Sequence, residues 1–141
     1  MKIELAVQSK EHTELIPVTQ EVQRVVSHQN WKQGVLTLFV PHTTSGIIIQ
    51  EQADPDVARD IIYALDKIVP WRDPKYHHAE GNTASHVKAA MLGTSAQCSV
   101  ENGKLVLGTW QGIFFCEFDG PRNRQLWLTF TRQEIASSGN R

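Results

Sequence analysis

The sharpest chemical pattern in this chain is a pair of histidines, His78 and His86, which bracket Asn82 at four-residue intervals. Gly81 and the capping character of Asn82 predict that His78 lies in a loop and His86 in the first turns of a helix. Both rings can then converge above a helix N-terminus, which suits an anion or a metal with an anionic ligand. A purely structural role, in which either ring caps or packs, is equally consistent with this spacing, which matches no standard zinc motif.

A second motif, His42-Thr43-Thr44-Ser45, forms a tight connection between two apolar segments. Its hydroxyl groups and turn amides can cradle an oxyanion, although Thr and Ser are also ordinary turn residues. Glu51 follows the second of these segments. If the two strands are antiparallel neighbours, Glu51 lies on the side of the histidine loop and is a candidate general base or metal ligand.

A third motif combines Trp110 and Gln111 with Arg122, which follows a glycine-proline turn. Trp110 offers a flat surface for a ring and Gln111 an amide that can recognise its edge, whereas the alternative is an aromatic that fills the core. The guanidinium of Arg122 suits a phosphate or carboxylate, although an internal pair with Glu117 or Asp119 is just as consistent with the sequence.

These motifs predict a pocket that binds a divalent metal, zinc or magnesium, and a phosphorylated small molecule. The proposed metal ligands are His42, His78 and His86, which with Glu51 are also the catalytic candidates. The ligand-binding candidates are Thr43, Thr44, Asn82, Trp110, Gln111 and Arg122. Of the other histidines, His12 and His28 are expected to be solvated and His77 is ambiguous.

The elements that must position these residues follow from apolar periodicity. Strands are predicted at 3–7, 35–40, 46–50, 95–100, 104–107, 110–118 and 126–131. Helices are predicted from a Thr19 cap to about residue 30, from Asp54-Pro55 to Pro70, and from Thr83 to Leu92. Asn102-Gly103 predicts a two-residue hairpin. Six or seven strands and three helices in this order favour a mixed antiparallel α+β fold.

The 141 residues fit a single domain, with a polar tail from about residue 133. A net charge of -1 gives no field for a nucleic-acid partner. No apolar run approaches the ~20 residues of a membrane span, so a cytoplasmic protein with no membrane partner is expected. Cys98 and Cys116 are expected to be buried free thiols.

The three motifs together, His42-Thr43-Thr44, His78 through His86, and Leu107 through Gly112 leading to Arg122, resemble the YjbQ family of small proteins. The likeness runs from about 35 to 131. It implies a compact α+β fold with a jelly-roll-like β-sandwich, and a homotrimer with pockets near subunit contacts. The family's recurring positions correspond here to His42, Thr43, Thr44, Glu51, Asp60, His78, Asn82, His86, Trp110, Gln111, Glu117, Arg122 and Arg124. Asp60 thereby becomes a fifth catalytic candidate.

The YjbQ family is often labelled a secondary thiamine-phosphate synthase, so the resemblance implies a transferase activity. Such a reaction joins a pyrimidine methyl pyrophosphate to a thiazole phosphate with loss of pyrophosphate. It requires cations near the leaving group and an aromatic surface for the pyrimidine ring. Trp110 and Tyr76 are candidates for that surface. A noncatalytic trimer that binds a metabolite or a metal in the same pocket is the alternative, and a purely structural trimer is a third hypothesis.

Overall fold

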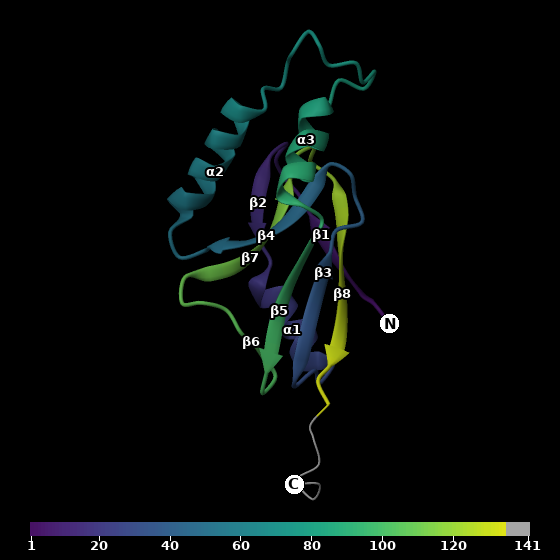
Figure 1. The fold of residues 1–141 in the computed structure, drawn as a ribbon, viewed down its shortest axis with the longest axis vertical. Helices are drawn as coiled ribbons and strands as arrows, with labels where there is room; N and C mark the ends of the chain where they lie inside the picture. The colour runs from purple at the N-terminus through teal and green to yellow at the C-terminus, as the bar shows by residue number, and fades with distance from the viewer. Residues whose placement is uncertain (135–141) are drawn as a thin grey trace, which may run out of the picture.

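A computed structural model describes residues 1–134 of the chain (Figure 1). The three helices are α1 (Thr19–His28), α2 (Pro55–Ile68) and α3 (Thr83–Leu92). The strands are β1 (Ile3–Gln8), β2 (Glu14–Pro17), β3 (Gly34–Phe39), β4 (Ser45–Glu51), β5 (Ser95–Glu101), β6 (Lys104–Leu105), β7 (Gln111–Glu117) and β8 (Asn123–Arg132). The predicted polar tail lies almost entirely outside the described residues.

The strands form two antiparallel sheets. One has five strands in the order β1-β8-β3-β5-β6, and the other has three in the order β2-β7-β4. The middle strand of the smaller sheet, β7, alternates its side chains between two apolar clusters. Ile113 and Phe115 join the main core, whereas Phe114 and Cys116 face the helical side.

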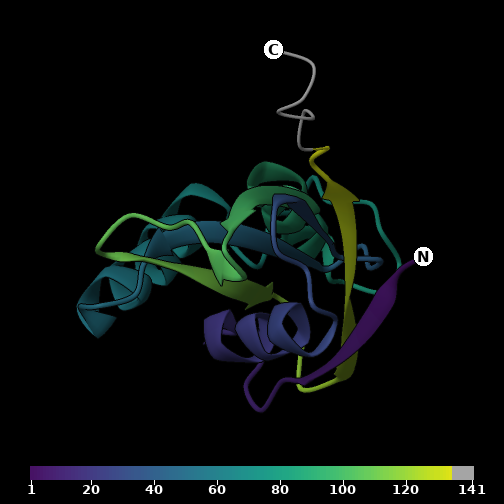
Figure 2. The ribbon, with the colours of Figure 1, turned by 90° about the horizontal axis from the view of Figure 1, so that it is seen from below.

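The main core fills the space between the two sheets and α1. Leu36 and Leu128 of the large sheet meet Phe115 of the small sheet, and Val22 and Val26 of α1 pack against them. Helices α2 and α3 cover the other face of the small sheet through Leu65 and Ala89. Figure 2 shows α1 and α3 on opposite sides of the band formed by β4 and β7. The small sheet is therefore the central layer of the molecule.

Local sequence signals are confirmed where hydrogen bonds within a few residues decide the structure. The Asp54 carboxylate caps α2 by accepting from the amide of Asp56 at 2.9 Å. Asn102 and Gly103 both adopt positive φ, 52° and 77°, as a two-residue hairpin turn requires. Cys98 and Cys116 are free and buried, and burial raises the pKa of the Cys116 thiol to about 12.

Three expectations are corrected. Thr19 does not cap α1, because its hydroxyl donates to Gln52 and accepts from the amide of Ile113 instead. Strand β2 was not predicted, because its four residues show no clear alternation and owe their conformation to pairing with β7. The strands that flank the His42 loop are not neighbours, since β3 belongs to the large sheet and β4 to the small one.

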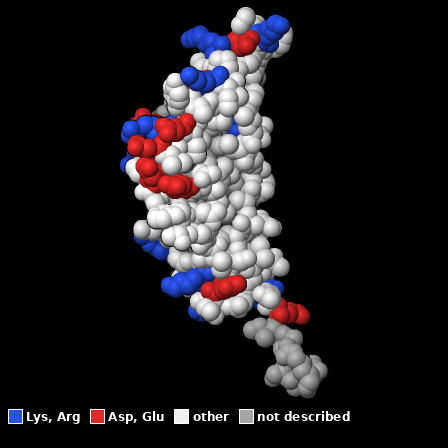
Figure 3. Space-filling model, turned by 60° about the vertical axis from the view of Figure 1, so that its left-hand side comes forward, with Lys and Arg blue, Asp and Glu red and all other residues white. Residues whose placement is uncertain are grey.

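The mixed α+β class, the antiparallel pairing and the three helices are confirmed. The jelly-roll-like sandwich is not established by this strand order and stays a prediction. Figure 3 shows one face with acidic and basic side chains interspersed near its edge and ends and a broad uncharged surface between them. None of the described helices combines the length and the apolar character needed to cross a bilayer.

Candidate functional site

Three connections that are distant in sequence enclose a pocket of about 400 Å³, which we call the histidine pocket. They are the β3–β4 loop, the α2–α3 loop with the first turn of α3, and the turn between β7 and β8. Its lining residues are Pro41, His42, Thr43, Thr44, His78, Glu80, Asn82, His86, Asp119, Arg122 and Arg124. The large and small sheets thus meet at this pocket through their loops.

His78 and His86 converge in the histidine pocket, as their spacing predicts. Their ring centroids lie 5.2 Å apart with the planes at 80°. The Nδ1 of His86 lies 3.1 Å from the carbonyl oxygen of Thr43. Because a carbonyl only accepts, Nδ1 carries a proton, and in the neutral ring the lone pair is therefore on Nε2. His86 can therefore accept a proton or bind a metal through Nε2.

His42 takes the opposite tautomer. Its Nε2 accepts a hydrogen bond from the amide of Gln125 at 2.9 Å, so the ring proton is on Nδ1. Burial lowers the pKa of His42, and the Arg124 guanidinium lowers it further. His42 is thus a neutral ring that can donate from Nδ1 but has no lone pair left for a metal.

A buried ion pair supports the floor of the pocket. Glu117 is fully buried and its carboxylate accepts two hydrogen bonds from Arg124, through Nε at 2.8 Å and Nη2 at 2.5 Å. Arg124 Nη2 also donates to the hydroxyl of Thr44 at 2.7 Å. Burial alone would raise the pKa of Glu117, but hydrogen bonds from Arg124, Ser9 and the Asp119 amide outweigh it and lower the pKa.

Asp119 organises the rim of the pocket. Its Oδ2 accepts from Arg122 Nη2 at 2.7 Å and from Asn82 Nδ2 at 2.9 Å. Its Oδ1 lies 3.5 Å from His12 Nε2, so His12 is held against the rim and is not simply solvated as expected. Of the two internal pairs that the sequence allowed for Arg122, the structure has the one with Asp119. The guanidinium is therefore oriented while it remains half exposed.

Asn82 precedes α3 as predicted, but its side chain makes no capping hydrogen bond. The bond from Nδ2 to Asp119 turns the amide away from the helix. Asn82 is 7% exposed, and its Oδ1 has no hydrogen-bond partner among residues 1–134. A buried carbonyl oxygen without a donor is costly, so Oδ1 is suited to accept from, or coordinate, a bound group.

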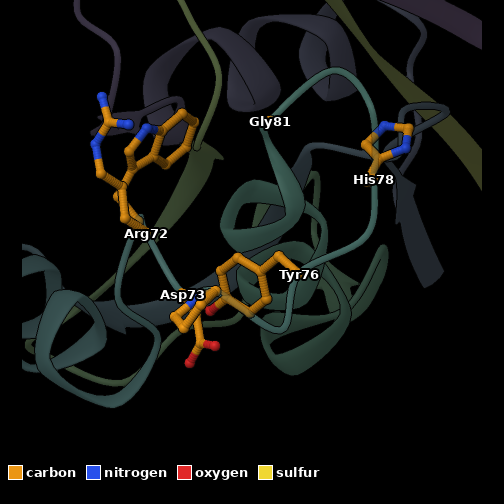
Figure 4. Close-up of a pocket in the computed structure, with 7 residues that line it drawn as sticks. Arg72, Asp73, Tyr76, His78 and Gly81 are labelled. Carbon is orange, nitrogen blue, oxygen red and sulfur yellow. The ribbon is translucent and has the colours of Figure 1, made fainter.

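A second hollow of about 350 Å³ lies beside the histidine pocket, inside the loop from Pro70 to Gly81, and shares His78 with it. We call it the loop hollow. Figure 4 shows Asp73 and Tyr76 on one side of this loop and His78 on the other. The hollow is also lined by Trp71, Arg72 and Pro74.

Comparison with known proteins identifies the family. The model of the UPF0047 protein YjbQ-like family matches residues 3–133. The chain belongs to the YjbQ-like family. It is 44% identical over 124 residues to the UPF0047 protein YugU of Bacillus subtilis, covering 88% of this chain and 94% of YugU. It is 40% identical to the UPF0047 protein MJ1081 of Methanocaldococcus jannaschii, covering 91% and 92%.

Solved YjbQ-like structures have the same fold. An uncharacterized conserved protein of the family from Clostridium acetobutylicum superposes with a TM-score of 0.88 at 46% identity, covering 92% of this chain and 99% of that one. The conserved hypothetical protein TT1486 from Thermus thermophilus superposes with a TM-score of 0.86 at 37% identity, with the same coverage. These likenesses support the described fold of the chain.

Four residues chosen from the sequence and the YjbQ-like resemblance do not line the histidine pocket of this chain: Glu51, Asp60, Trp110 and Gln111. Glu51 ends β4, the strand that begins at the histidine loop, so the length of β4 separates it from His42. Glu51 pairs with Gln111, which places those two together at the far end of the small sheet. Asp60 is exposed on α2, and Trp110 is 64% exposed.

The predicted metal set of His42, His78 and His86 does not form one cluster. Within residues 1–134, no group of three or more His, Cys, Asp or Glu side chains is arranged to hold a metal ion. The physical reason lies in His42, whose only lone pair is used by the Gln125 amide. The available donors are His78, His86 Nε2 and Asn82 Oδ1.

Sequence reasoning missed Glu80 and the organising roles of Ser9 and Asp119. The Ser9 hydroxyl donates to Glu117 at 2.7 Å and accepts from the amide of Arg122 at 2.8 Å, across more than 100 residues of chain. No local pattern marks such a contact. Asp119 was recognisable only as one of two acids near Arg122.

Proposed function

We propose that this chain is a small-molecule enzyme that binds a phosphorylated ligand in the histidine pocket, where His86 acts as a proton acceptor or a metal ligand. The observation that carries the proposal is that two histidines of one pocket use opposite ring nitrogens for their backbone hydrogen bonds. His86 presents a lone pair at Nε2, and His42 presents a proton at Nδ1. A ring that can take a proton beside one that donates a hydrogen bond without losing its proton is an arrangement that suits a general base next to a group that polarises a ligand oxygen.

The phosphate would be held by the cationic side of the pocket. Arg122 is oriented by Asp119 but half exposed, so its guanidinium can also reach a ligand. The first turn of α3 contributes amide groups without intrahelical partners and a partial positive charge. Arg124 adds little net charge, because Glu117 neutralises it. The anion site would therefore rest on Arg122, His42 and the start of α3.

We propose that the remaining donors hold a divalent metal. Zinc accepts imidazole nitrogen and oxygen ligands, whereas magnesium prefers oxygen, so the pair His78 and His86 with Asn82 Oδ1 favours zinc. A bound zinc ion would polarise a ligand oxygen. The two roles of His86 are alternatives, because Nε2 can hold a ligand proton only where it does not bind the metal; in either case the residues of this chain would orient the ligand.

Thiamine-phosphate synthesis, carried by the family resemblance, is proposed as a secondary activity of the pocket. Its loss of pyrophosphate needs cationic groups near the leaving group, which Arg122 and the start of α3 could provide. The trimeric state is proposed as well. The outer face of the large sheet carries Val35 and Phe39, 37% and 41% exposed, and α2 leaves Tyr63 and Ile68 exposed, all of which a neighbouring copy could cover.

The proposal is tested by measuring pyrophosphate release from the pyrimidine pyrophosphate and thiazole phosphate, with and without zinc, for the wild type, His86→Gln and His28→Gln. His28 is an exposed histidine in the last turn of α1 and serves as the matched control. We expect the His86 variant to lose at least ~100-fold in rate, the usual contribution of one acid–base group. The His28 variant should match the wild type.

The alternative function is a noncatalytic trimer that binds a metabolite or a metal in the same pocket. It is favoured if the wild type binds a phosphate ester but releases no pyrophosphate under any of these conditions. Equal rates for the His86 and His28 variants would contradict the catalytic role of His86.

A further inference from the structure

We infer that the loop hollow is a recess for a planar aromatic ring, and that it forms one continuous ligand site with the histidine pocket. This inference rests on the proposed binding of a phosphate in that pocket and adds where the rest of the ligand lies. The ligand class is a small phosphate ester that carries an aromatic ring. Trp71 and Tyr76 would then determine specificity, a role that neither the sequence motifs nor the comparisons assign to Trp71.

The lining of the loop hollow suits a ring. Trp71 and Tyr76 provide flat apolar surfaces, and Pro74 adds a third rigid apolar group. Trp71 is 39% exposed and lies three residues after the end of α2. Arg72 and Asp73 add a donor and an acceptor for polar substituents of a ring. Aromatic walls with a few polar groups are typical of small-molecule pockets.

The walls of the loop hollow are held in place before any ligand binds. The hydroxyl of Tyr76 donates to the carbonyl oxygen of Pro70 at 2.9 Å. The backbone amide of Tyr76 donates to the carbonyl oxygen of Asp73 at 3.1 Å. The Asp73 carboxylate accepts from the amide of Lys75 at 2.9 Å. Trp71 packs edge-to-face against His12, with ring centroids 4.8 Å apart. A ring would therefore bind without ordering a loose loop.

The two cavities are neighbours that share His78, which lines both. The loop turns back after His78, where the amide of Gly81 donates to the His78 carbonyl at 3.1 Å with a φ of 74° at Gly81. This turn sets Gly81, which lines the loop hollow, beside Glu80 and Asn82, which line the histidine pocket. Contact also runs from Trp71 through His12 to Asp119, the residue that orients Arg122.

The experiment compares two phosphate esters that differ in the ring, benzyl phosphate and methyl phosphate, by calorimetric titration of the full chain. For the wild type we expect benzyl phosphate to bind at least ~10-fold more tightly, the gain typical of one aromatic contact. The variants Trp71→Leu and Tyr76→Leu should lose that preference but keep the wild-type affinity for methyl phosphate. Tyr63→Leu is the matched control, because Tyr63 is 60% exposed on α2 away from both cavities, and it should keep the preference.

Each outcome separates the two claims. If methyl phosphate binds and benzyl phosphate binds no more tightly, the ring recess is wrong while the proposed function stands. The recess is also wrong if the preference survives in both loop variants, or if Trp110→Leu removes it instead. If neither ester binds the wild type, the proposed phosphate pocket fails. Unchanged affinity of the loop variants for methyl phosphate also shows that they fold.

Discussion

At the scale of single residues, the pair formed by Glu117 and Arg124 determines the shape of the histidine pocket. The charges of both side chains are almost completely buried. Arg124 also donates to the Thr44 hydroxyl in the β3–β4 loop, and Glu117 accepts from the Ser9 hydroxyl after β1. A buried pair of this kind contributes little net stability, yet loss of one partner leaves a charge without compensation. The stability of the protein is therefore expected to fall when one partner of the pair is replaced and to change little when both are replaced together.

Glu117→Gln is predicted to lower the free energy of unfolding at pH 7 by about 3 kcal/mol, the usual cost of an unpaired buried charge. The double variant Glu117→Leu/Arg124→Leu should recover most of this loss, because it leaves no buried charge. Urea denaturation measures both. A single variant within 1 kcal/mol of the wild type, by the same principle, would contradict the role of the pair.

The same carboxylate predicts a pH dependence. Because the folded pKa of Glu117 lies below its ordinary value of 4.5, the stabilisation is complete above pH 4.5 and is lost as the pH falls below that value through the folded pKa. Glu117→Gln should lack this part of the acid sensitivity. The urea midpoint is measured at falling pH from about 6, a range that includes the ordinary pKa of a glutamate. As the pH falls, the midpoint should decrease less steeply in the variant than in the wild type. Parallel slopes would contradict the assignment.

The candidate site shows which residue roles are readable from sequence. The convergence of His78 and His86 follows from spacing around one helix start, so it is predicted correctly. The lone pair of His42 is lost to the amide of Gln125, 83 residues away, which no local pattern reveals. Glu51 was misplaced for a similar reason, because its position depends on which strands pair.

At the scale of elements, the position of α3 depends on its close approach to β4. The amide of Ile47 donates to the carbonyl oxygen of Gly93, at the C-terminal end of α3, at 3.1 Å. Gly46 makes room for this approach, since a Cβ there would lie 2.7 Å from the Gly93 oxygen. The sequence predicted α3 itself from its cap position and terminal glycine, but not what the helix packs against.

Gly46→Ala is accordingly predicted to destabilise the chain by about 1–3 kcal/mol, the range for overpacking a tight contact. It should also weaken zinc binding, because α3 carries His86. The control is Gly108→Ala, whose Cβ would meet only the flexible side chain of Gln111. Urea denaturation and a zinc titration give the two values. Equal behaviour of both variants would show that α3 does not depend on this contact.

At the scale of the whole molecule, the exposed large apolar residues other than Trp71 lie outside the two cavities. The large sheet has α1 and the small sheet on its inner side, while Phe39 and Trp127 form a ring pair, centroids 5.9 Å apart, that lies on its outer face. The composition and the strand patterns predicted a single α+β domain, because apolar periodicity shows which side chains are buried within the chain. They do not specify the partner that such a face would contact.

The trimer is predicted to form through this outer face. Phe39→Lys should convert particles of three times the chain mass of 15.9 kDa to single chains, because a lysine cannot be buried there without a partner. Light scattering coupled to size exclusion measures the mass. Thr37→Lys places a lysine on the same face at a position that is already polar, so we expect it to lower the particle mass less than Phe39→Lys does. A wild-type protein that elutes as a single chain at micromolar concentration would contradict the trimer.

Phosphate binding in the histidine pocket is measured by the dissociation constant of methyl phosphate for the wild type and for Arg122→Gln. Arg59→Gln is the control, because Arg59 is an exposed arginine on α2 whose side chain pairs only with Asp56 among the described contacts. We expect at least a ~10-fold weaker affinity for the Arg122 variant, because it loses one charge-assisted hydrogen bond, and no change for the Arg59 variant. Equal affinity of the wild type and the Arg122 variant would contradict phosphate binding in this pocket.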